Sequence, residues 1–81
     1  MQRQTFKVTS TAGQVVLKHA WNAARRAVEA IMREHAAKRG ATYWRGAKSY
    51  LKMGGEHVRG KECWYNENEP SDQITFTIER L

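Results

Sequence analysis

The sequence has little material for chemistry that depends on cysteine or on clustered metal ligands. It contains one cysteine, Cys63, and three histidines among 81 residues. A single cysteine excludes an internal disulfide. One cysteine and three histidines also cannot build the common structural zinc sites, which use four clustered cysteines and histidines. We therefore expect a protein of a reducing compartment that needs neither metal nor cofactor.

Long apolar runs are also missing. Residues 1–10 alternate polar and apolar side chains rather than forming the apolar centre of a signal peptide, and no segment has the length and hydropathy of a membrane span. A chain of 81 residues makes one domain, and a domain of this size buries only roughly 60% of the surface of its unfolded chain. We expect residues 1–81 to form a single cytoplasmic domain without a membrane partner.

Acidic residues are scarce over most of the chain. Residues 1–61 carry thirteen Lys and Arg against three Asp and Glu, a charge of about +10. Residues 62–81 carry five acids against Arg80 alone, a charge of about −4, and the two parts add up to the net charge of +6. A positive field concentrated in one region steers polyanions or acidic protein surfaces towards it. The charge therefore indicates a class of partner and no particular activity.

The first half of the chain changes its apolar period once. Phe6 and Val8 alternate with polar residues, as in a half-buried strand. The apolar residues that then recur at steps of three and four, and so share one face of a helix, are Leu17, Ala20, Trp21, Ala24, Ala27, Val28 and Ile31. We expect a helix over residues 12–39 of roughly 40 Å at ~1.5 Å per residue, with Thr11 and Gln14 as a capping box and Gly40 at its end. In the alternative, Asn22 caps a shorter helix and residues 14–17 pair back on the first strand.

The second half has a period of two. Leu51 and Met53 fall on one side of a predicted strand and Lys48, Tyr50 and Lys52 on the other. In residues 73–79, Ile74, Phe76 and Ile78 likewise oppose Thr75, Thr77 and Glu79. Turns are expected at Gly46, Gly54–Gly55, Gly60 and the stretch from Asn66 to Asp72. The pattern predicts an α+β fold, with one long amphipathic helix packed on one face of a four- or five-stranded antiparallel sheet in β-α-β-β-β order.

One helix covers one face of such a sheet, so the other face stays in water. We place Lys7, Lys48, Tyr50, Lys52, Thr75 and Thr77 on that uncovered face. Aromatic residues interleaved with cations suit base stacking and phosphate neutralisation, and they suit protein interfaces equally. The predicted partner-binding residues are Trp44, Arg45, Lys48, Tyr50, Lys52, Arg59 and Lys61.

The polar side of the helix is a second candidate face. It carries Lys18, Arg25, Arg26 and Arg33. The simpler interpretation is a solvated surface on which Glu29 pairs with Arg25 and Arg33 at i, i+4 spacing. For Trp44 and Trp64 the simpler interpretation is that they are large core residues.

No motif predicts a catalytic, metal or cofactor residue. Gly55 to Lys61 matches the G-x4-G-K core of a P-loop, but Glu62 stands where that motif needs Ser or Thr, and a glycine-hinged basic loop explains the match better. Cys63 and His57 lack an orienting third group and an oxyanion site, and a lone cysteine is usually an inert core residue. His19 and His35 lie about 160° apart around the predicted helix, so they cannot share one metal.

The chain as a whole has one Arg/Ala-rich helix, which includes residues 23–30 (Ala-Ala-Arg-Arg-Ala-Val-Glu-Ala), a few strands, basic-aromatic loops and no active-site motif. In architecture and composition it resembles the small phage-encoded inhibitors of bacterial defence, in particular anti-CRISPR proteins that act on type I surveillance complexes. The resemblance covers all 81 residues but no diagnostic motif. It implies a non-enzymatic protein that sits on a Cas subunit and blocks binding of target DNA.

The residues alone leave two kinds of partner open: the acidic surface of a protein, or nucleic acid bound directly. Glu67 and Glu69 near the basic residues favour a bipolar protein contact, so we expect an acidic protein partner, with direct nucleic-acid binding as the alternative. A membrane-surface role is disfavoured because Trp21 lies on the apolar side of the predicted helix.

Overall fold

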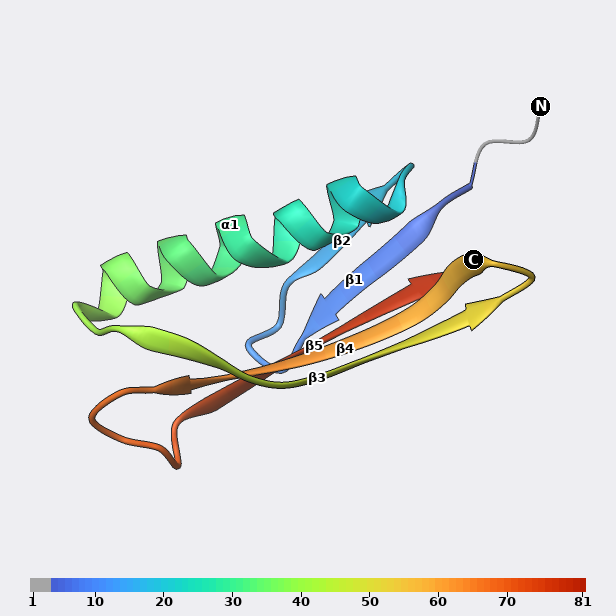
Figure 1. The fold of residues 1–81 in the computed structure, drawn as a ribbon. Helices are drawn as coiled ribbons and strands as arrows, with labels where there is room; N and C mark the ends of the chain where they lie inside the picture. Colours follow the sequence, from blue (N-terminus) through green and yellow to red (C-terminus); the bar gives the residue numbers. More distant parts are fainter. Residues whose placement is uncertain (1–3) are drawn as a thin grey trace.

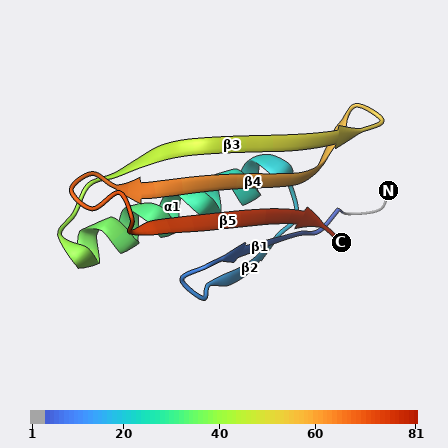
Figure 2. The same ribbon diagram turned by 90° about the horizontal axis from the view of Figure 1, so that it is seen from below.

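The computed structural model describes residues 4–81. Residues 1–3, which belong to the alternating N-terminal segment, lie outside it. The described chain forms a five-stranded antiparallel sheet with one helix across one face (Figures 1 and 2). The elements are β1 (Phe6–Ser10), β2 (Val15–Lys18), α1 (Trp21–Arg39), β3 (Tyr43–Met53), β4 (Glu56–Asn66) and β5 (Gln73–Arg80). In space the strands follow the order β2-β1-β5-β4-β3. The predicted fold class is confirmed, but the element order is β-β-α-β-β-β, because a short strand precedes the helix.

That short strand, β2, corrects the predicted start of the helix. Leu17 lies opposite Lys7 in the β1–β2 ladder, so the alternative in which residues 14–17 pair back on the first strand is right. Val15 and Val16 favour this outcome because β-branched side chains fit a pleated strand better than a helix. The helix begins at Trp21 and is therefore shorter than predicted.

Both predicted caps at the start of the helix are wrong. Ser10 Oγ accepts hydrogen bonds from the backbone N–H groups of Ala12 (3.2 Å) and Gln14 (3.3 Å), which organises the β1–β2 turn instead of a helix start. Ala20 occupies the N-cap position without a side-chain cap, so Asn22 is not the cap. The predicted end is confirmed: Gly40 adopts a left-handed conformation (φ 61°), and its N–H is directed at the carbonyls of Ala36 and Ala37.

The core lies between α1 and the middle strands. Its buried apolar members are Phe6, Val8, Ala24, Val28, Met32, Tyr43, Ile74, Phe76 and Ile78. The predicted inward phase of β1 and β5 is therefore confirmed. Burial of each large apolar side chain contributes about 1.5–3 kcal/mol, so this layer supplies most of the stability of the fold.

A β-bulge in β3 exchanges the two faces on which the side chains after it were predicted to lie. Arg45 pairs with Trp64 and Lys48 pairs with Glu62, so two residues of β3, Gly46 and Ala47, lie opposite the single residue Cys63. One extra residue moves every later side chain to the other face. Gly46 suits this position because a Cβ there would lie 3.3 Å from the Cys63 carbonyl oxygen.

The reversal moves the basic side of β3 towards the helix. Lys48, Tyr50 and Lys52, predicted on the uncovered face, point to the side of the sheet that carries α1, whereas Leu51 and Met53 point to the uncovered face and are 50% and 64% exposed. Lys7, Thr75 and Thr77 do lie on the uncovered face, as predicted.

Two glycines predicted to form turns lie inside strands instead. Gly46 is part of β3 and Gly60 is part of β4. A Cβ on Gly60 would lie 2.7 Å from Trp21 Cη2 and 3.0 Å from Tyr50 Cδ1, so Gly60 provides the space in which these two rings meet. The P-loop-like segment is thus a tight turn at Gly54–Gly55 followed by strand β4, and the predicted glycine-hinged loop is wrong beyond Gly55.

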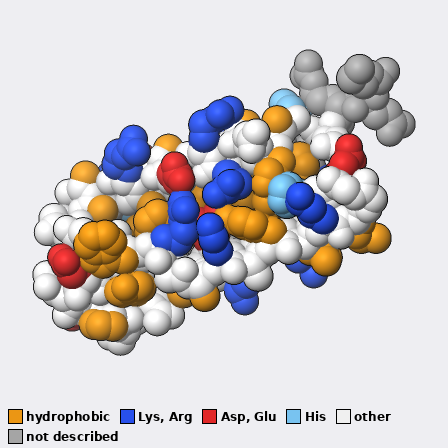
Figure 3. Space-filling view, in the orientation of Figure 1, with side chains coloured by type: hydrophobic (Ala, Val, Ile, Leu, Met, Phe, Trp, Pro, Cys, Tyr) orange, Lys and Arg blue, Asp and Glu red, His pale blue; other side chains and the backbone are white. Residues whose placement is uncertain are grey.

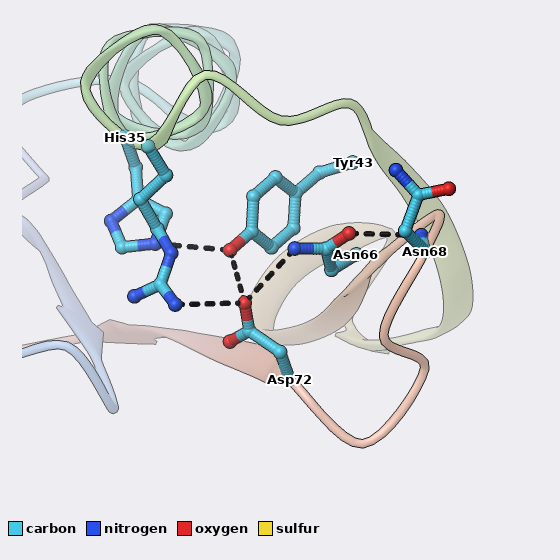
Figure 4. A network of polar contacts seen from close by, with 6 residues as sticks. His35, Tyr43, Asn66, Asn68 and Asp72 are labelled. Atoms are coloured by element: carbon cyan, nitrogen blue, oxygen red, sulfur yellow. Dashed lines mark hydrogen bonds and ion pairs between the residues drawn. The ribbon is translucent and has the colours of Figure 1, made fainter.

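The predicted loop before Gln73 is confirmed over residues 67–72, although Asn66 itself ends β4, and a polar network ties this loop to the end of the helix (Figure 4). Tyr43 O–H donates to Asp72 Oδ2 at 2.5 Å, and Asn66 Nδ2 donates to the same oxygen at 3.3 Å. Arg39 Nη2 lies 3.4 Å from it. The hydrogen bond from Tyr43 and that from Asn66 lower the pKa of Asp72, while burial and the bond to Asp72 raise the pKa of Tyr43.

Candidate functional site

Basic side chains gather around Tyr50 on the side of β3 that faces α1. The guanidinium carbon of Arg25 lies 5.2 Å from the centroid of the Tyr50 ring, and Lys48 Nζ lies 6.0 Å from it. Arg45 precedes them on the same side of β3 and Lys52 follows. We call Arg25, Arg45, Lys48 and Lys52 the cationic cluster. Figure 3 shows Lys and Arg side chains gathered near the middle of this face, with hydrophobic and acidic side chains between them.

A buried carboxylate, that of Glu62, lies beneath this cluster and contacts Tyr50 and Arg45. The residue is 1% exposed, and Tyr50 O–H donates to Glu62 Oε2 at 3.0 Å. Arg45 Nε lies 3.0 Å from Glu62 Oε1, although neither atom makes a well-directed hydrogen bond, so the contact is an ion pair. Removal of a carboxylate from water costs several kcal/mol unless it is paired. Glu62 therefore fixes the positions of Tyr50 and Arg45.

The Arg45 side chain makes its contacts within the protein. Its Nη2 donates to Glu29 Oε1 on the helix at 2.7 Å, and its guanidinium lies 4.9 Å from the centre of the Trp64 ring. The predicted pairs of Glu29 with Arg25 and Arg33 are therefore wrong: within residues 4–81 the ion pair of Glu29 is with Arg45 on the sheet. Arg45 therefore pairs with two acids at once, the buried Glu62 of β4 and Glu29 of α1.

Tyr50 and Arg45 keep their protonation states around neutral pH. Burial, followed by the hydrogen bond to Glu62, raises the pKa of Tyr50. Partial burial works against the charge of Arg45, but the hydrogen bond to Glu29 and the Glu62 carboxylate outweigh it and raise its pKa. Tyr50 thus remains a hydrogen-bond donor and Arg45 remains a cation.

The other cations of this face are free to meet a partner. Among the residues that the structure describes, none of the following lies within 4.0 Å of a carboxylate oxygen: Arg25, Arg26, Arg33, Lys48 and Lys52. The Nε of Arg25 is buried and has no hydrogen-bond partner in this part of the chain. The face therefore presents positive charge that its own acids do not neutralise.

The structure divides the predicted partner-binding residues between two faces. Arg45, Lys48, Tyr50 and Lys52 join Arg25, which we had predicted on the second face. Trp44, Arg59 and Lys61 lie on the uncovered face of the sheet, where Trp44 pairs with Tyr65 and Lys61 pairs with Thr77. Lys18 is set apart from both groups, on β2 opposite Phe6. Arg26 and Arg33 remain on the exposed side of α1.

Sequence reasoning missed a stacked pair at the start of the helix. The rings of Trp21 and His57 stack with centroids 4.4 Å apart and an interplanar angle of 3°. Burial lowers the pKa of His57, and the nearby charges of Lys52 and Arg25 lower it further, so this imidazole is neutral at pH 7. His57 lies on the helix side and Cys63 on the uncovered face, so the two do not form a nucleophile–base pair.

Sequence reasoning also missed the role of Glu62, although a signal for it was present. Glu62 has the same phase in β4 as Trp64, which packs against the core. An acid in phase with core residues is a candidate for a buried ion pair. Cys63, in contrast, is out of phase with the core and is half-buried, with its Sγ 3.5 Å from Gln73 Oε1, so the prediction of a core cysteine is wrong.

Within residues 4–81, no group of three or more His, Cys, Asp or Glu is placed to hold a metal ion. No helix in the same range is long and apolar enough to cross a membrane. Comparisons with protein-family models, curated proteins and solved structures found no match to this chain.

Proposed function

We propose that this chain is a non-enzymatic binding module that docks its cationic cluster on an acidic surface of a protein partner. The observation that carries the proposal is the set of free cations on the face formed by α1 and β3, where Arg25, Lys48 and Lys52 have no carboxylate within ion-pair distance among the described residues. The buried Glu62 and its bonds to Tyr50 and Arg45 hold the middle of this surface in place. A rigid arrangement of cations loses less conformational entropy on binding than a set of mobile side chains does.

The aromatic rings near the cluster favour a protein partner over nucleic acid. Arg25 and Lys48 lie near the Tyr50 ring, and the Trp21 ring lies perpendicular to it, at an interplanar angle of 89°. Trp21 is itself stacked on His57, and Trp64 lies under Arg45. These rings are engaged within the protein, whereas binding of single strands depends on open aromatic faces on which bases stack.

The exposed apolar side chains favour the same conclusion. They are Val15, Leu17, Trp44, Leu51, Met53 and Leu81. All but Trp44 are aliphatic, so they cannot stack on bases but can pack against a protein. The alternative function, direct nucleic-acid binding, would use Trp44 with Arg59 and Lys61 on the uncovered face.

Salt dependence separates the two functions. A protein that makes about six phosphate contacts loses roughly a thousandfold in affinity between about 50 and 200 mM salt. We expect only weak binding, without sequence preference, when labelled single- and double-stranded DNA are titrated with the protein at about 150 mM salt. We expect an acidic peptide, poly-glutamate, to compete for the same face. Sub-micromolar affinity for DNA under these conditions would overturn the protein-partner proposal in favour of the alternative.

The resemblance to anti-CRISPR proteins supports a more specific proposal, in which the partner is a cytoplasmic, nucleic-acid-handling complex and the module blocks its access to DNA. The test adds the protein to a purified type I surveillance complex and measures binding of target DNA. Inhibition by the natural protein that is lost in the Lys48→Glu/Lys52→Glu variant would support it. Unchanged DNA binding at saturating protein would contradict the inhibitor function for such a complex.

A further inference from the structure

The outer edge of β3 is a second feature of the same region. β3 has eleven residues and is hydrogen-bonded to a neighbouring strand, β4, on one side, because it ends the sheet order β2-β1-β5-β4-β3 of the described chain. The opposite edge strand, β2, has only four residues. A long edge presents a row of backbone N–H and C=O groups that an additional strand can pair with. The bulge at Gly46 and Ala47 interrupts this row. A second register shift, between Leu51 and Lys52, comes from an extra residue on β4, Val58, so β3 itself carries no inserted residue over residues 48–53.

The two faces of this edge differ in chemistry. Arg45, Lys48 and Lys52 lie on the helix side, and residues 43–53 contain no acid. Trp44, Leu51 and Met53 lie on the uncovered side and are 50%, 50% and 64% exposed. The edge strand therefore has a basic face and an apolar face, and both are accessible.

Lysines and bulges at a sheet edge commonly prevent unwanted pairing, and here they act against a second copy of the chain. Two β3 strands side by side would bring Lys48 and Lys52 close to the same cations of the other copy, and like charges on neighbouring strands are destabilising. The same cations attract a strand that carries acids. Protection of the edge also does not explain why Leu51 and Met53 are left exposed beside it.

We propose that residues 48–53 of β3 accept an extended segment of the partner protein as an additional strand, in which Asp or Glu alternates with apolar residues. The acids of that segment lie beside Lys48 and Lys52, and its apolar residues lie beside Leu51 and Met53. Backbone hydrogen bonds give affinity in this mode of recognition, and the alternating side chains give specificity. The inference rests on the proposed function, and it specifies that the acidic surface of the partner is an extended strand.

The first experiment uses synthetic peptides as probes. One peptide alternates Glu with Val, and its control has the same composition with all Glu residues in one block and all Val residues in another. Two further peptides carry N-methyl groups on alternate amides, along one edge or along the other. Fluorescence anisotropy measures binding to the full chain, and hydrogen exchange follows the amides of β3.

We expect the alternating peptide to bind, the block peptide to bind much more weakly, and N-methylation to weaken binding by roughly tenfold or more on one edge only. The alternate amides of residues 48–53 that point away from β4 gain protection in the complex. Equal binding of alternating, block and N-methylated peptides would overturn the added strand and leave the proposed function in place. If no acidic peptide binds, both proposals fail, and self-association through β3 in sedimentation would show that the occupant is a second copy.

The chain provides a matched control for the protein side. Leu51–Lys52 on β3 and Leu17–Lys18 on β2 are both Leu-Lys pairs on edge strands, and the two leucines are exposed to similar extents, 50% and 55%. We expect the Leu51→Ser/Lys52→Glu variant to lose binding of the alternating peptide and the Leu17→Ser/Lys18→Glu variant to keep it. Equal loss in both variants would overturn the assignment to β3. Circular dichroism and thermal unfolding of both variants verify that the fold persists.

Discussion

The two regions beneath α1 are built in different ways. Towards β1 and β5 the helix rests on Phe6, Phe76 and Ile78, which bring no polar atoms into the core. Towards β3 and β4 it faces Glu62, Tyr50 and Arg45, whose polar groups must satisfy one another. Apolar burial is strongly favourable, whereas a buried ion pair repays little more than its own desolvation. We infer that the first region supplies stability and the second supplies a fixed cationic surface.

The largest expected effect is in the apolar region. Phe76 is 1% exposed and belongs to the core cluster. Phe76→Ala should lower the free energy of unfolding by about 3–5 kcal/mol because it removes buried area and leaves a cavity. Urea denaturation checks this value. A loss below about 1 kcal/mol, typical of a surface change, would show that the core is not centred on β5.

The next effect is in the polar region. Glu62→Ala removes the partner of Arg45 and the acceptor of Tyr50, and we expect a loss of about 2–3 kcal/mol because two polar groups lose a partner. Glu29→Gln is the control, since Glu29 is exposed and its pair with Arg45 should contribute about 0–1 kcal/mol. Urea denaturation of both variants checks the difference. Equal losses would contradict the structural role of Glu62.

Two glycines, Gly60 and Gly46, test how tightly the polar region is packed. Gly60→Ala places a methyl group 2.7 Å from Trp21 Cη2, and overpacking of this kind costs about 1–3 kcal/mol. Gly46→Ala, whose Cβ would lie 3.3 Å from the Cys63 carbonyl oxygen, should cost less. Thermal unfolding compares them. Gly46→Ala as the more harmful variant would mean that the bulge is tighter than the meeting point of Trp21 and Tyr50.

The smallest expected effect concerns pH and the loop of Asp72. The pKa of this carboxyl is lowered by hydrogen bonds from Tyr43 and Asn66. Its contribution to stability is therefore present above the unfolded pKa, near 3.8, and is lost as the pH falls through the lower folded pKa. Tyr43→Phe should make unfolding less dependent on pH in this acidic window. An unchanged acid dependence, measured by denaturation as a function of pH, would contradict the role of Tyr43.

The sequence was sufficient to predict the apolar region and insufficient for the polar one. Phe6 and Val8, and the alternation around Phe76, have the phase of uninterrupted strands, and Gly40 ends the helix as expected. The alternation predicted within residues 48–53 of β3 is right, but the faces are exchanged, because the bulge at Gly46 adds one residue and turns Leu51 and Met53 away from the core. The sequence did not predict a bulge at Gly46 and Ala47, because a glycine at position 46 fits a turn equally well.

The sequence identified several residues of the candidate site but did not predict which face of the sheet they share. Lys48, Tyr50 and Lys52 were identified by their chemistry, but their face depended on the bulge. Arg25 of α1 joined them through a tertiary contact, since its guanidinium carbon lies 5.2 Å from the centroid of the Tyr50 ring. The burial of Glu62 depends on tertiary contacts with Arg45 and Tyr50 that lie far away in sequence.

The central claim is that the cations on the helix side, and not those on the uncovered face, meet the acids of the partner. Two pairs of charge reversals compare them directly: Lys48→Glu/Lys52→Glu on the helix side and Arg59→Glu/Lys61→Glu on the uncovered face. Both pairs change the net charge equally, so a general electrostatic effect is the same in both. Binding of the alternating Glu/Val peptide, measured by anisotropy at about 150 mM salt, should be lost in the first variant and largely kept in the second. Loss in the second with binding kept in the first would contradict the account.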